Sequence, residues 1–211
     1  MYDGDMAWDT ERTRTLLLDA ATAEFSATGL AGARIDRIAA AAGVNKERIY
    51  SYFGNKDGLF EAVLRRELDD VLRGDVAIDG TGPAAFADYV DGLVDRYERH
   101  PHLPRLLAWE GLERGSDPIA RDARRPSCIV KVEAIERVLP GIDPADAEHL
   151  LLSALTLAGG IWALPQMAVL ICGAEGASGV DQRRSALRTQ AAALAQSFLP
   201  AAEEHSDSAA R

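Results

Sequence analysis

The stretch RIDRIAAAAGVNKERIYSYF, residues 34–53, predicts two short helices joined by a glycine turn. Ile35, Ile38 and Ile49 recur at helical spacing on either side of Gly43, and glycine suits the left-handed backbone at a helix end. Asn45 is placed to cap the second helix at its N-terminus. Such a pair forms a helix-turn-helix, whose second helix enters the major groove of DNA.

Polar and basic side chains are left on the outer faces of this pair. The N-terminal residues of a recognition helix read base edges, while neighbouring residues hold phosphates. Lys46 and Arg48 are the natural donors to base edges or phosphates, and Tyr50, Tyr52 and Lys56 suit phosphate oxygens. Asn45 and Ser51 are also available. On spacing alone, a helical hairpin with solvated charges remains an equal alternative.

The charge of the whole chain argues against DNA binding at first sight, because the formal net charge is −10. Residues 34–56 hold five basic and two acidic side chains, so this stretch is +3 and the remainder is −13. Screening over about 8 Å at physiological salt makes the local sign matter more than the total. The acidity therefore does not exclude DNA binding by this segment.

Residues 16–64, from LLLDAATAEF through AAGVNKERIYSYF to NKDGLFEAVL, resemble the N-terminal domain of TetR/AcrR-type transcriptional regulators. The resemblance implies a three-helix DNA-binding head, a divergent helical ligand domain and a homodimer. It further implies repression of a palindromic operator that is released when a small molecule binds. Carried over by position, Tyr50, Tyr52 and Lys56 would contact phosphates, and Asn45 and Lys46 would begin the recognition helix with Arg48.

Two departures from the family pattern concern the same head. Ala33 and Arg34 stand where a Thr or Ser commonly caps the second helix, so the hydroxyl cap is lost and Arg34 is expected to contact the phosphate instead. Glu47 stands beside Arg48 and would repel phosphates unless it meets a cytosine or an arginine. Two alternatives therefore stay open: a protein of this fold that acts through protein contacts with altered DNA binding, and an activator.

Helical periodicity dominates the rest of the chain, and no alternating strand pattern is convincing, so the fold class is all-α. Glycine and proline after residue 73 predict a domain boundary near residue 75. We expect a disordered arm over residues 1–9, the DNA-binding domain over 10–74, a helical ligand-binding and dimerisation domain over 75–200, and a disordered tail over 201–211. Helices are expected at 10–28, 35–42, after Asn45, at 56–73, from Pro83, and at 106–113, 117–139, 145–163 and 180–199, with a short extra turn at 165–173.

Residues 150–174 contain no charged side chain, which meets the length of a membrane span. Internal glycines, Pro165 and the lack of flanking Lys/Arg asymmetry weaken that interpretation, so we expect no membrane. A helix buried by its own subunit and by a partner is apolar nearly all round. The family resemblance implies that the last two long helices of each subunit form an intersubunit four-helix bundle. The homodimer interface is therefore expected at Leu151, Leu155, Leu187, Ala191, Leu194 and Phe198, although a face packed only within one chain would show the same seam in the final helix.

A small-molecule effector would bind in the C-terminal half, where pockets are apolar with a few polar groups. Candidates for that pocket are Tyr97, Trp109, Glu110, Cys128, Trp162 and Met167, although ordinary core packing is the better explanation for each of them taken alone. His149 is expected to be a hydrogen-bonded core histidine, and His100 and His102 to lie at a helix end or the surface.

Enzyme signatures are absent from the sequence: it has no GxSxG, GxxxxGK[ST], HExxH or Glu-x-x-His pattern. Two cysteines and four histidines without zinc spacing predict neither a metal site nor a cofactor. The start of the chain is acidic and lacks an apolar run, so it is not expected to be a secretory signal. Two distant cysteines fit a reducing cytoplasm, and the missing signatures lead us to expect a protein that is not an enzyme.

Overall fold

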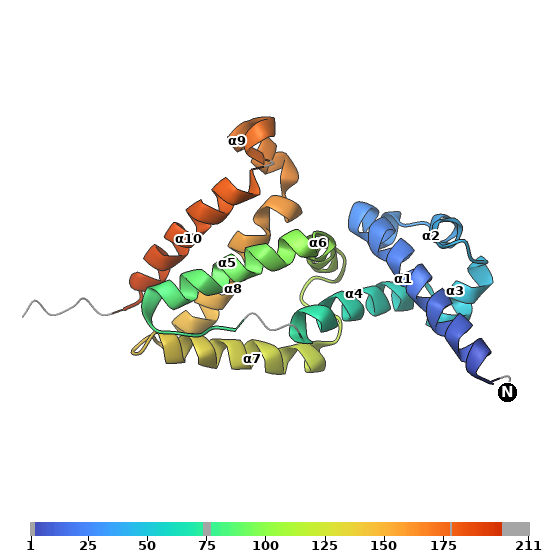
Figure 1. The fold of residues 1–211 in the computed structure, drawn as a ribbon, viewed down its shortest axis with the longest axis horizontal. Coiled ribbons are helices and arrows are strands. Elements are labelled where there is room, and N and C mark those ends of the chain that lie inside the picture. The colour runs from blue at the N-terminus through green and yellow to red at the C-terminus, as the bar shows by residue number, and fades with distance from the viewer. Residues whose placement is uncertain (1–2, 74–76, 178, 200–211) are drawn as a thin grey trace, which may run out of the picture.

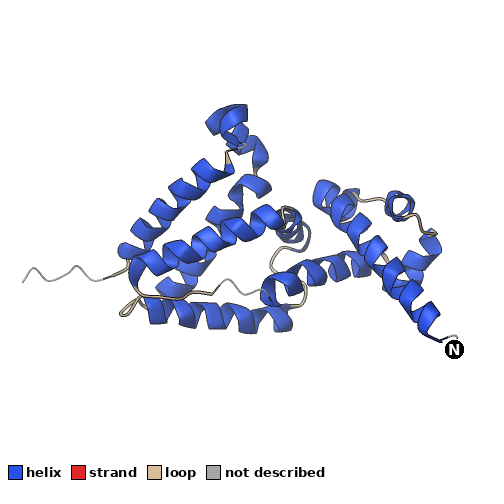
Figure 2. Ribbon diagram, viewed as in Figure 1, coloured by secondary structure: helices blue, strands red, loops and turns tan. Residues whose placement is uncertain are grey.

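The computed structural model describes residues 3–73, 77–177 and 179–199, and within these ranges the protein consists of helices and their connections (Figure 1, Figure 2). The helices are α1 (Asp3–Gly32), α2 (Ile35–Ala42), α3 (Lys46–Phe53), α4 (Lys56–Arg73), α5 (Gly82–Arg99), α6 (His102–Arg114), α7 (Arg121–Val138), α8 (Pro144–Ala163), α9 (Pro165–Ala177) and α10 (Val180–Gln196). The predicted all-α class is confirmed.

The N-terminal end of the protein differs from the prediction, because the first helix begins earlier than expected. α1 starts at Asp3, which corrects the expected disordered arm for residues 3–9. Nothing there forces the backbone out of a helix, since one glycine costs only about 1 kcal/mol. The predicted domain boundary near residue 75 and the predicted tail, 201–211, lie outside the described residues.

The N-terminal head, α1 to α4, closes around one apolar cluster. Leu17, Ala21 and Phe25 of α1 are fully buried, as the helical spacing predicts. The ring of Phe25 meets that of Phe60 edge to face at 5.1 Å between centroids, a favourable arrangement for aromatic pairs. Burial of one stripe on each helix therefore fixes how α4 crosses α1.

The C-terminal body is built on α5, whose predicted stripe Phe86, Tyr89, Val90, Leu93, Val94 and Tyr97 is entirely buried. On the other side of α5, acidic residues pair with α10. Arg184 donates from Nε and Nη2 to the two oxygens of Asp91 at 2.6 and 2.7 Å, and Arg188 pairs with Asp88. The hydrogen bonds from Arg184 hold the pKa of Asp91 below its usual range. These ion pairs fasten α10 along α5 of the same chain.

Helix α6 joins the head to the body, and it lies against the C-terminal end of α1. Arg105 donates from Nε to the carbonyl oxygen of Ser26 at 2.8 Å, and the Ser26 hydroxyl lies 3.0 Å from Nδ1 of His102. Glu113 accepts the backbone N–H of Ala31 at 3.0 Å. Side chains of the body therefore satisfy backbone groups at the end of a head helix.

Those backbone groups are free because α1 breaks at Gly29, where φ is 70° and ψ is 179°. This region of the backbone map is open almost only to glycine. A β-carbon at Gly29 would also lie 2.6 Å from the Trp109 ring and 2.7 Å from the Glu113 carboxylate. Close approach of α6 thus requires glycine at this position for two independent reasons.

The apolar stretch of the body does not form a straight span. Among the described residues, no single helix is long and apolar enough to cross a membrane. Pro144–Ala163 and Pro165–Gly173 reach the threshold only together, and the two helices meet at an angle of 81°. The expected short extra segment at 165–173 is the first part of α9, which leaves α8 at this bend (Figure 1) and breaks at Gly173, where φ is 75° and ψ is 171°.

Candidate nucleic-acid interface

The turn between α2 and α3 has the geometry that the sequence predicts. Gly43 adopts φ 65°, and its N–H bonds to the carbonyl oxygens of Ala39 and Ala40. Asn45 caps α3, and its side-chain oxygen accepts the N–H of Glu47 at 3.3 Å. Ile38 and Ile49 are fully buried on the inner side, so the outer face of α3 is left free for a partner.

Three of the predicted contact residues lie on that outer face. Arg48 and Ser51 are exposed, and half of the Tyr50 surface is accessible. Arg48 donates from Nη1 to the hydroxyl of Tyr52 at 3.4 Å, and Tyr52 is half-buried. Arg48 thus presents its guanidinium beside the phenol of Tyr52, one turn further along the same short helix.

Lys46 is less available than the sequence indicates. Its ammonium group donates to Asp36 of α2 at 3.2 Å, and both side chains are exposed. The hydrogen bond and the charge of Asp36 raise the pKa of Lys46. An internal carboxylate therefore competes with DNA for this cation.

Lys56, at the N-terminus of α4, holds the loop that precedes α2. Its ammonium group donates to the carbonyl oxygens of Ala31 and Ala33, each at 3.3 Å. A lysine ammonium has three donors, so one N–H is still available to a phosphate. The predicted contact residue thus also anchors the backbone of the head.

Arg34 occupies the N-cap of α2 without a side-chain cap, as the departure from the family pattern predicts. Glu24 satisfies a different donor, since its carboxylate accepts the backbone N–H of Arg34 itself at 3.2 Å. The same carboxylate lies 3.8 Å from the guanidinium of Arg37. The Arg34 side chain itself is exposed beside these groups, in a position suited to a phosphate.

Sequence reasoning missed Arg14 of α1. Its guanidinium carbon lies 5.4 Å from the centre of the Phe53 ring at the end of α3, within the range of a cation–π contact. The contact brings a further exposed cation beside the recognition helix. No local pattern could reveal it, because the two residues are far apart in the chain.

The predicted pocket residues of the body do not converge on one site. Cys128 lines a hollow of about 580 Å³ between α7 and α8, while Tyr97 lines one of about 410 Å³ between α5, α6 and α8. Trp162 meets the Tyr97 ring at 6.0 Å. Met167 and Trp109 line two smaller hollows of about 230 and 180 Å³.

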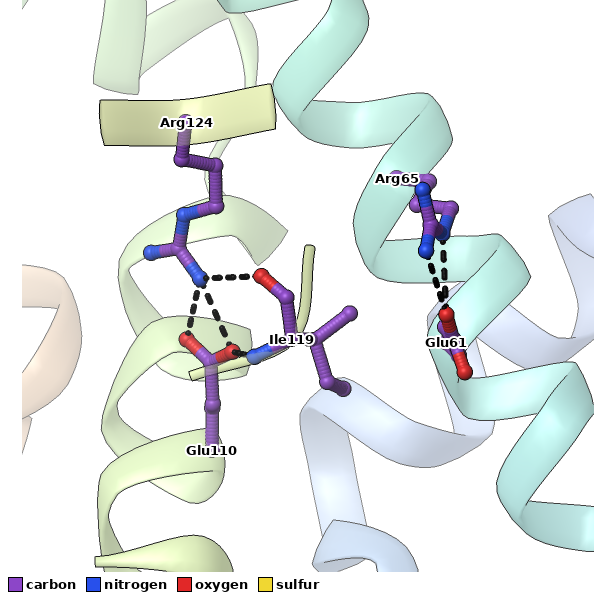
Figure 3. Close-up of polar contacts among 5 residues, drawn as sticks. All are labelled: Glu61, Arg65, Glu110, Ile119 and Arg124. Atoms are coloured by element: carbon purple, nitrogen blue, oxygen red, sulfur yellow. Dashed lines mark hydrogen bonds and ion pairs between the residues drawn. The ribbon is translucent and has the colours of Figure 1, made fainter. Parts of the chain in front are cut away.

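Among the pocket candidates, Glu110 is buried and bonded within its own chain (Figure 3). Arg124 donates from Nη1 to both of its oxygens at 2.9 Å, and the Ile119 N–H donates to it at 2.7 Å. A buried carboxylate needs such partners. Glu110 therefore secures the loop before α7, and both of its oxygens accept hydrogen bonds within the chain. A second, exposed pair in the same view, Glu61 with Arg65, lies along α4.

The predicted interface residues also divide into two groups. Leu187 and Ala191 are buried against the body of their own chain, so they have no area left for a partner. Leu151 and Leu155 line the hollow between α7 and α8, and Leu194 and Phe198 are partly buried. Periodicity identified the apolar face of α10 correctly but not the helix that covers it.

The remaining observations concern the positions of two histidines and the arrangement of side chains that could bind a metal ion. His149, expected in the core, is exposed on α8, whereas His102 lies at the contact with α1. Within the part of the chain that the structure describes, no group of three or more His, Cys, Asp or Glu side chains is arranged to hold a metal ion.

Comparison with known proteins identifies both halves. Residues 17–63 match the family described as bacterial regulatory proteins of the tetR family, and residues 86–193 match the tetracyclin repressor-like C-terminal domain. The HTH-type transcriptional repressor SCO4008 of Streptomyces coelicolor is 38% identical over 88% of this chain and 96% of its own. The HTH-type transcriptional repressor NicS of Pseudomonas putida is 36% identical over 53% of this chain and 54% of its own.

A solved structure agrees with these relatives. The crystal structure of the transcriptional regulator SCO4942 from Streptomyces coelicolor superposes with a TM-score of 0.69, at 31% identity, over 85% of this chain and 96% of that one. Together with the exposed recognition helix, these matches establish a DNA-binding transcriptional repressor rather than an enzyme. The chain belongs to the tetR family of bacterial regulatory proteins.

Proposed function

We propose that this repressor binds a palindromic operator as a homodimer, in the cytoplasm, and leaves it when a small-molecule effector occupies the C-terminal body. The observation that carries the proposal is the outer face of α3, where Arg48, Tyr50 and Ser51 project from a helix whose opposite face is buried at Ile49. Arg48 would read a base, and Tyr50 and Lys56 would hold phosphates, as in other helix-turn-helix proteins.

A two-fold dimer is needed to place two such heads on one operator. The surface that best suits a second copy is the outward face of α8 together with α9. Leu152 is 59% exposed, Leu164 52%, Leu170 77% and Ile171 75%. Monomeric proteins rarely expose large apolar patches, so exposed apolar side chains in this number favour an interaction site. This surface takes the place of the α10 seam expected from the sequence.

An effector site in the body is supported by the match of residues 86–193 to a tetracyclin repressor-like domain. Two of its hollows, of about 580 and 410 Å³, fall within the roughly 300–1,000 Å³ of small-molecule pockets. In a dimer, the distance between the two DNA-binding heads can differ between a DNA-bound and a released state. Effector binding changes the affinity for DNA only if the effector binds one of these two states more tightly than the other.

The DNA-binding part is tested by selecting genomic fragments with the purified protein and titrating the best site at several salt concentrations. We expect one short palindrome, bound specifically, with affinity lost in Lys56→Ala. If no sequence is enriched even after the protein has been denatured and refolded to remove a bound effector, the head does not read DNA and the proposal is wrong.

The dimer is tested separately by sedimentation. Leu170→Glu combined with Ile171→Glu is expected to convert the dimer to a monomer, because two charges cannot be buried there without partners. Leu112→Glu is the matched control, since Leu112 is equally exposed, at 77%, but lies on α6. A dimer that tolerates the α9 changes and dissociates with the control would refute this interface.

A further inference from the structure

An acidic residue lies at the centre of the outer face of α3. An α-helix turns by about 100° per residue, so Glu47 lies about 200° around the axis from the buried Ile49 and faces away from the head. Ser51 follows one turn later on the same side, and both side chains are exposed. The Glu47 carboxylate is therefore part of the surface that would enter the major groove.

The position of Glu47 along α3 is fixed by the cap. Asn45 precedes the helix, and its side-chain oxygen accepts the Glu47 N–H at 3.3 Å, so Glu47 belongs to the first turn. The helix dipole favours a carboxylate in this turn, which explains how the free protein accommodates it. Recognition helices read base edges with their N-terminal residues. In a complex, the same carboxylate has to meet the DNA.

Glu47 has no cationic partner of its own within the described part of the chain. No hydrogen bond or ion pair of its carboxylate is found there. The hydrogen bond and charge of Asp36, and to a smaller extent the charge of Glu47, raise the pKa of Lys46, but the Lys46 ammonium group donates to Asp36. Cations pair instead with other acidic residues of the head, which are Asp19, Glu24, Asp36, Glu61 and Glu67.

The arginines near Glu47 in the sequence are engaged elsewhere. Arg48 donates to the Tyr52 hydroxyl at 3.4 Å, and adjacent residues of a helix do not face each other. Arg37 of α2 lies 3.8 Å from Glu24. Of the two partners that would offset the repulsion between Glu47 and phosphate, an arginine and a cytosine, the folded chain does not supply the first.

An unpaired carboxylate in the major groove is costly unless a donor meets it. The phosphates surround the groove with negative charge, and a carboxylate that loses its hydration without a hydrogen bond is destabilised. Two bases present a donor there, cytosine through its N4 amine and adenine through its N6 amine. Adenine also presents the N7 acceptor beside its amine, which repels a carboxylate, whereas cytosine presents only the donor. The chemistry of the groove therefore favours cytosine.

We propose that Glu47 is a specificity-determining residue of the DNA-binding head, whose carboxylate accepts a hydrogen bond from the N4 amine of one cytosine in each half of the operator. This assignment rests on the proposed operator binding. It adds a second base reader to Arg48 and names the base. The departure from the family pattern then becomes a sequence preference rather than a defect of the head.

Glu47 and Arg48 make complementary demands on the operator. Arginine donates to O6 and N7 of guanine, and glutamate accepts from N4 of cytosine. The two side chains leave α3 about 100° apart, so they point to different parts of the groove. Each half of the operator is therefore expected to hold a cytosine and a guanine close together.

The experiment measures the affinity of the full-length protein for every single-base change in one half of the best selected operator. One cytosine should be required, and each replacement of it should weaken binding about ten-fold or more. Glu47→Ala should accept all four bases at that position almost equally and keep its preferences elsewhere. Glu47→Gln should prefer adenine there, because an amide accepts from N6 and donates to N7.

The N4 amine itself is tested by replacing that cytosine with 2-pyrimidinone, which lacks only the amino group. The replacement should weaken binding of the unmodified protein about ten-fold, since a hydrogen bond to a charged group is lost. Glu47→Ala meets the same altered duplex, so a general change in the DNA cancels in the comparison. An equal loss in the two proteins would show that Glu47 does not contact the amine.

Asp57→Asn is the matched control for charge, because Asp57 is another exposed carboxylate, in the first turn of α4. It should strengthen binding to every sequence alike by reducing the repulsion of phosphate. If Glu47→Ala gives the same uniform gain and loses no preference, Glu47 only repels the backbone and the assignment is wrong.

The assignment is also wrong if Glu47→Ala selects an operator and the unmodified protein selects none, because Glu47 then blocks DNA binding. Both of these results leave a head that binds DNA, so they contradict the role of Glu47 alone. Selection of no sequence by any of the proteins would overturn the proposed operator binding and the role of Glu47 with it.

Discussion

The DNA-binding head and the C-terminal body are both helical, yet they encode function differently. In the head, Asn45, Arg48 and Tyr50 lie within one short stretch, and the local turn at Gly43 already sets their arrangement. In the body, Tyr97, Leu107 and Gly160 come from three helices and meet only through packing. A surface read by DNA can be local in sequence, whereas a cavity is a property of the assembled fold.

The largest effect is expected at the contact between the two halves, where α6 of the body packs against α1 of the head. Gly29→Ala should destabilise the protein by about 3 kcal/mol or more, because it adds a clash with Trp109 to a backbone conformation open almost only to glycine. Chemical unfolding followed by circular dichroism measures the loss.

Gly43→Ala is the matched control for backbone strain alone. Gly43 has φ 65°, but nothing lies within 4 Å of its added β-carbon, so a loss of about 1–2 kcal/mol is expected. If both variants lose the same stability, the close approach of α6 to α1 contributes nothing and the halves are joined more loosely than the structure indicates.

Within the head, two cations sharpen the distinction between reading bases and holding phosphates. Arg48→Ala should cost about 1–3 kcal/mol at one base position and relax the preference there. Lys56→Met should weaken all sequences alike and lower the salt slope by about one. Binding measured on a set of single-base operator variants at several salt concentrations separates the two effects.

The opposite assignment is also visible in that experiment. If Arg48→Ala weakens every sequence equally and lowers the salt slope, Arg48 is a phosphate contact. Tyr50→Phe keeps the ring and removes only the hydroxyl, so it serves as the milder companion variant. Its effect should be uniform across operators and smaller than that of Lys56→Met.

The same division explains how much the sequence alone could predict. The helices at 35–42 and 56–73, and the buried positions Leu17 and Phe25, follow from periodicity and caps within a few residues, and the structure has them as expected. The exposure of Arg48, Tyr50 and Ser51 on α3 follows from the same local pattern, while their contacts with DNA stay predictions. Local patterns determine local geometry, and the head depends on little else.

The sequence was least informative where a role depends on a distant partner. The apolar stripe of Leu187 is real, but periodicity cannot tell whether α5 or a second subunit covers it. Glu110 is an acidic residue in an apolar region, which suggests a ligand until Arg124 is found beside it. The contact of Arg14 with Phe53 was invisible for the same reason.

The ion pairs between α5 and α10 offer a test within the body that depends on pH. The pKa of Asp91 is lowered in the folded state, chiefly by hydrogen bonds from Arg184, so the pair stabilises the protein above the ordinary pKa of the carboxyl group. That contribution is lost as the pH falls through the lowered folded-state pKa.

Asp91→Asn should therefore reduce stability at pH 7 by about 1 kcal/mol, a modest value because the pair is partly exposed. The difference from the unmodified protein should shrink as the solution becomes strongly acidic. Urea unfolding across the acid range measures it. A difference that is independent of pH would mean that packing, rather than the charge of Asp91, fastens α10 to α5.

The smallest expected effect concerns the acidic residue that competes with DNA for Lys46. Asp36→Asn removes the carboxylate that accepts the Lys46 hydrogen bond at 3.2 Å, and it raises the local positive charge of the head. Operator affinity should rise about two- to five-fold, with a steeper salt dependence, because one more cation is free to meet phosphate. Asp57→Asn, which removes an exposed carboxylate at the start of α4, controls for charge alone. Equal gains from the two variants would show that only the overall charge matters. A loss of specific binding in Asp36→Asn would show instead that Asp36 positions Lys46 for a base, so that the pair is part of the reading surface.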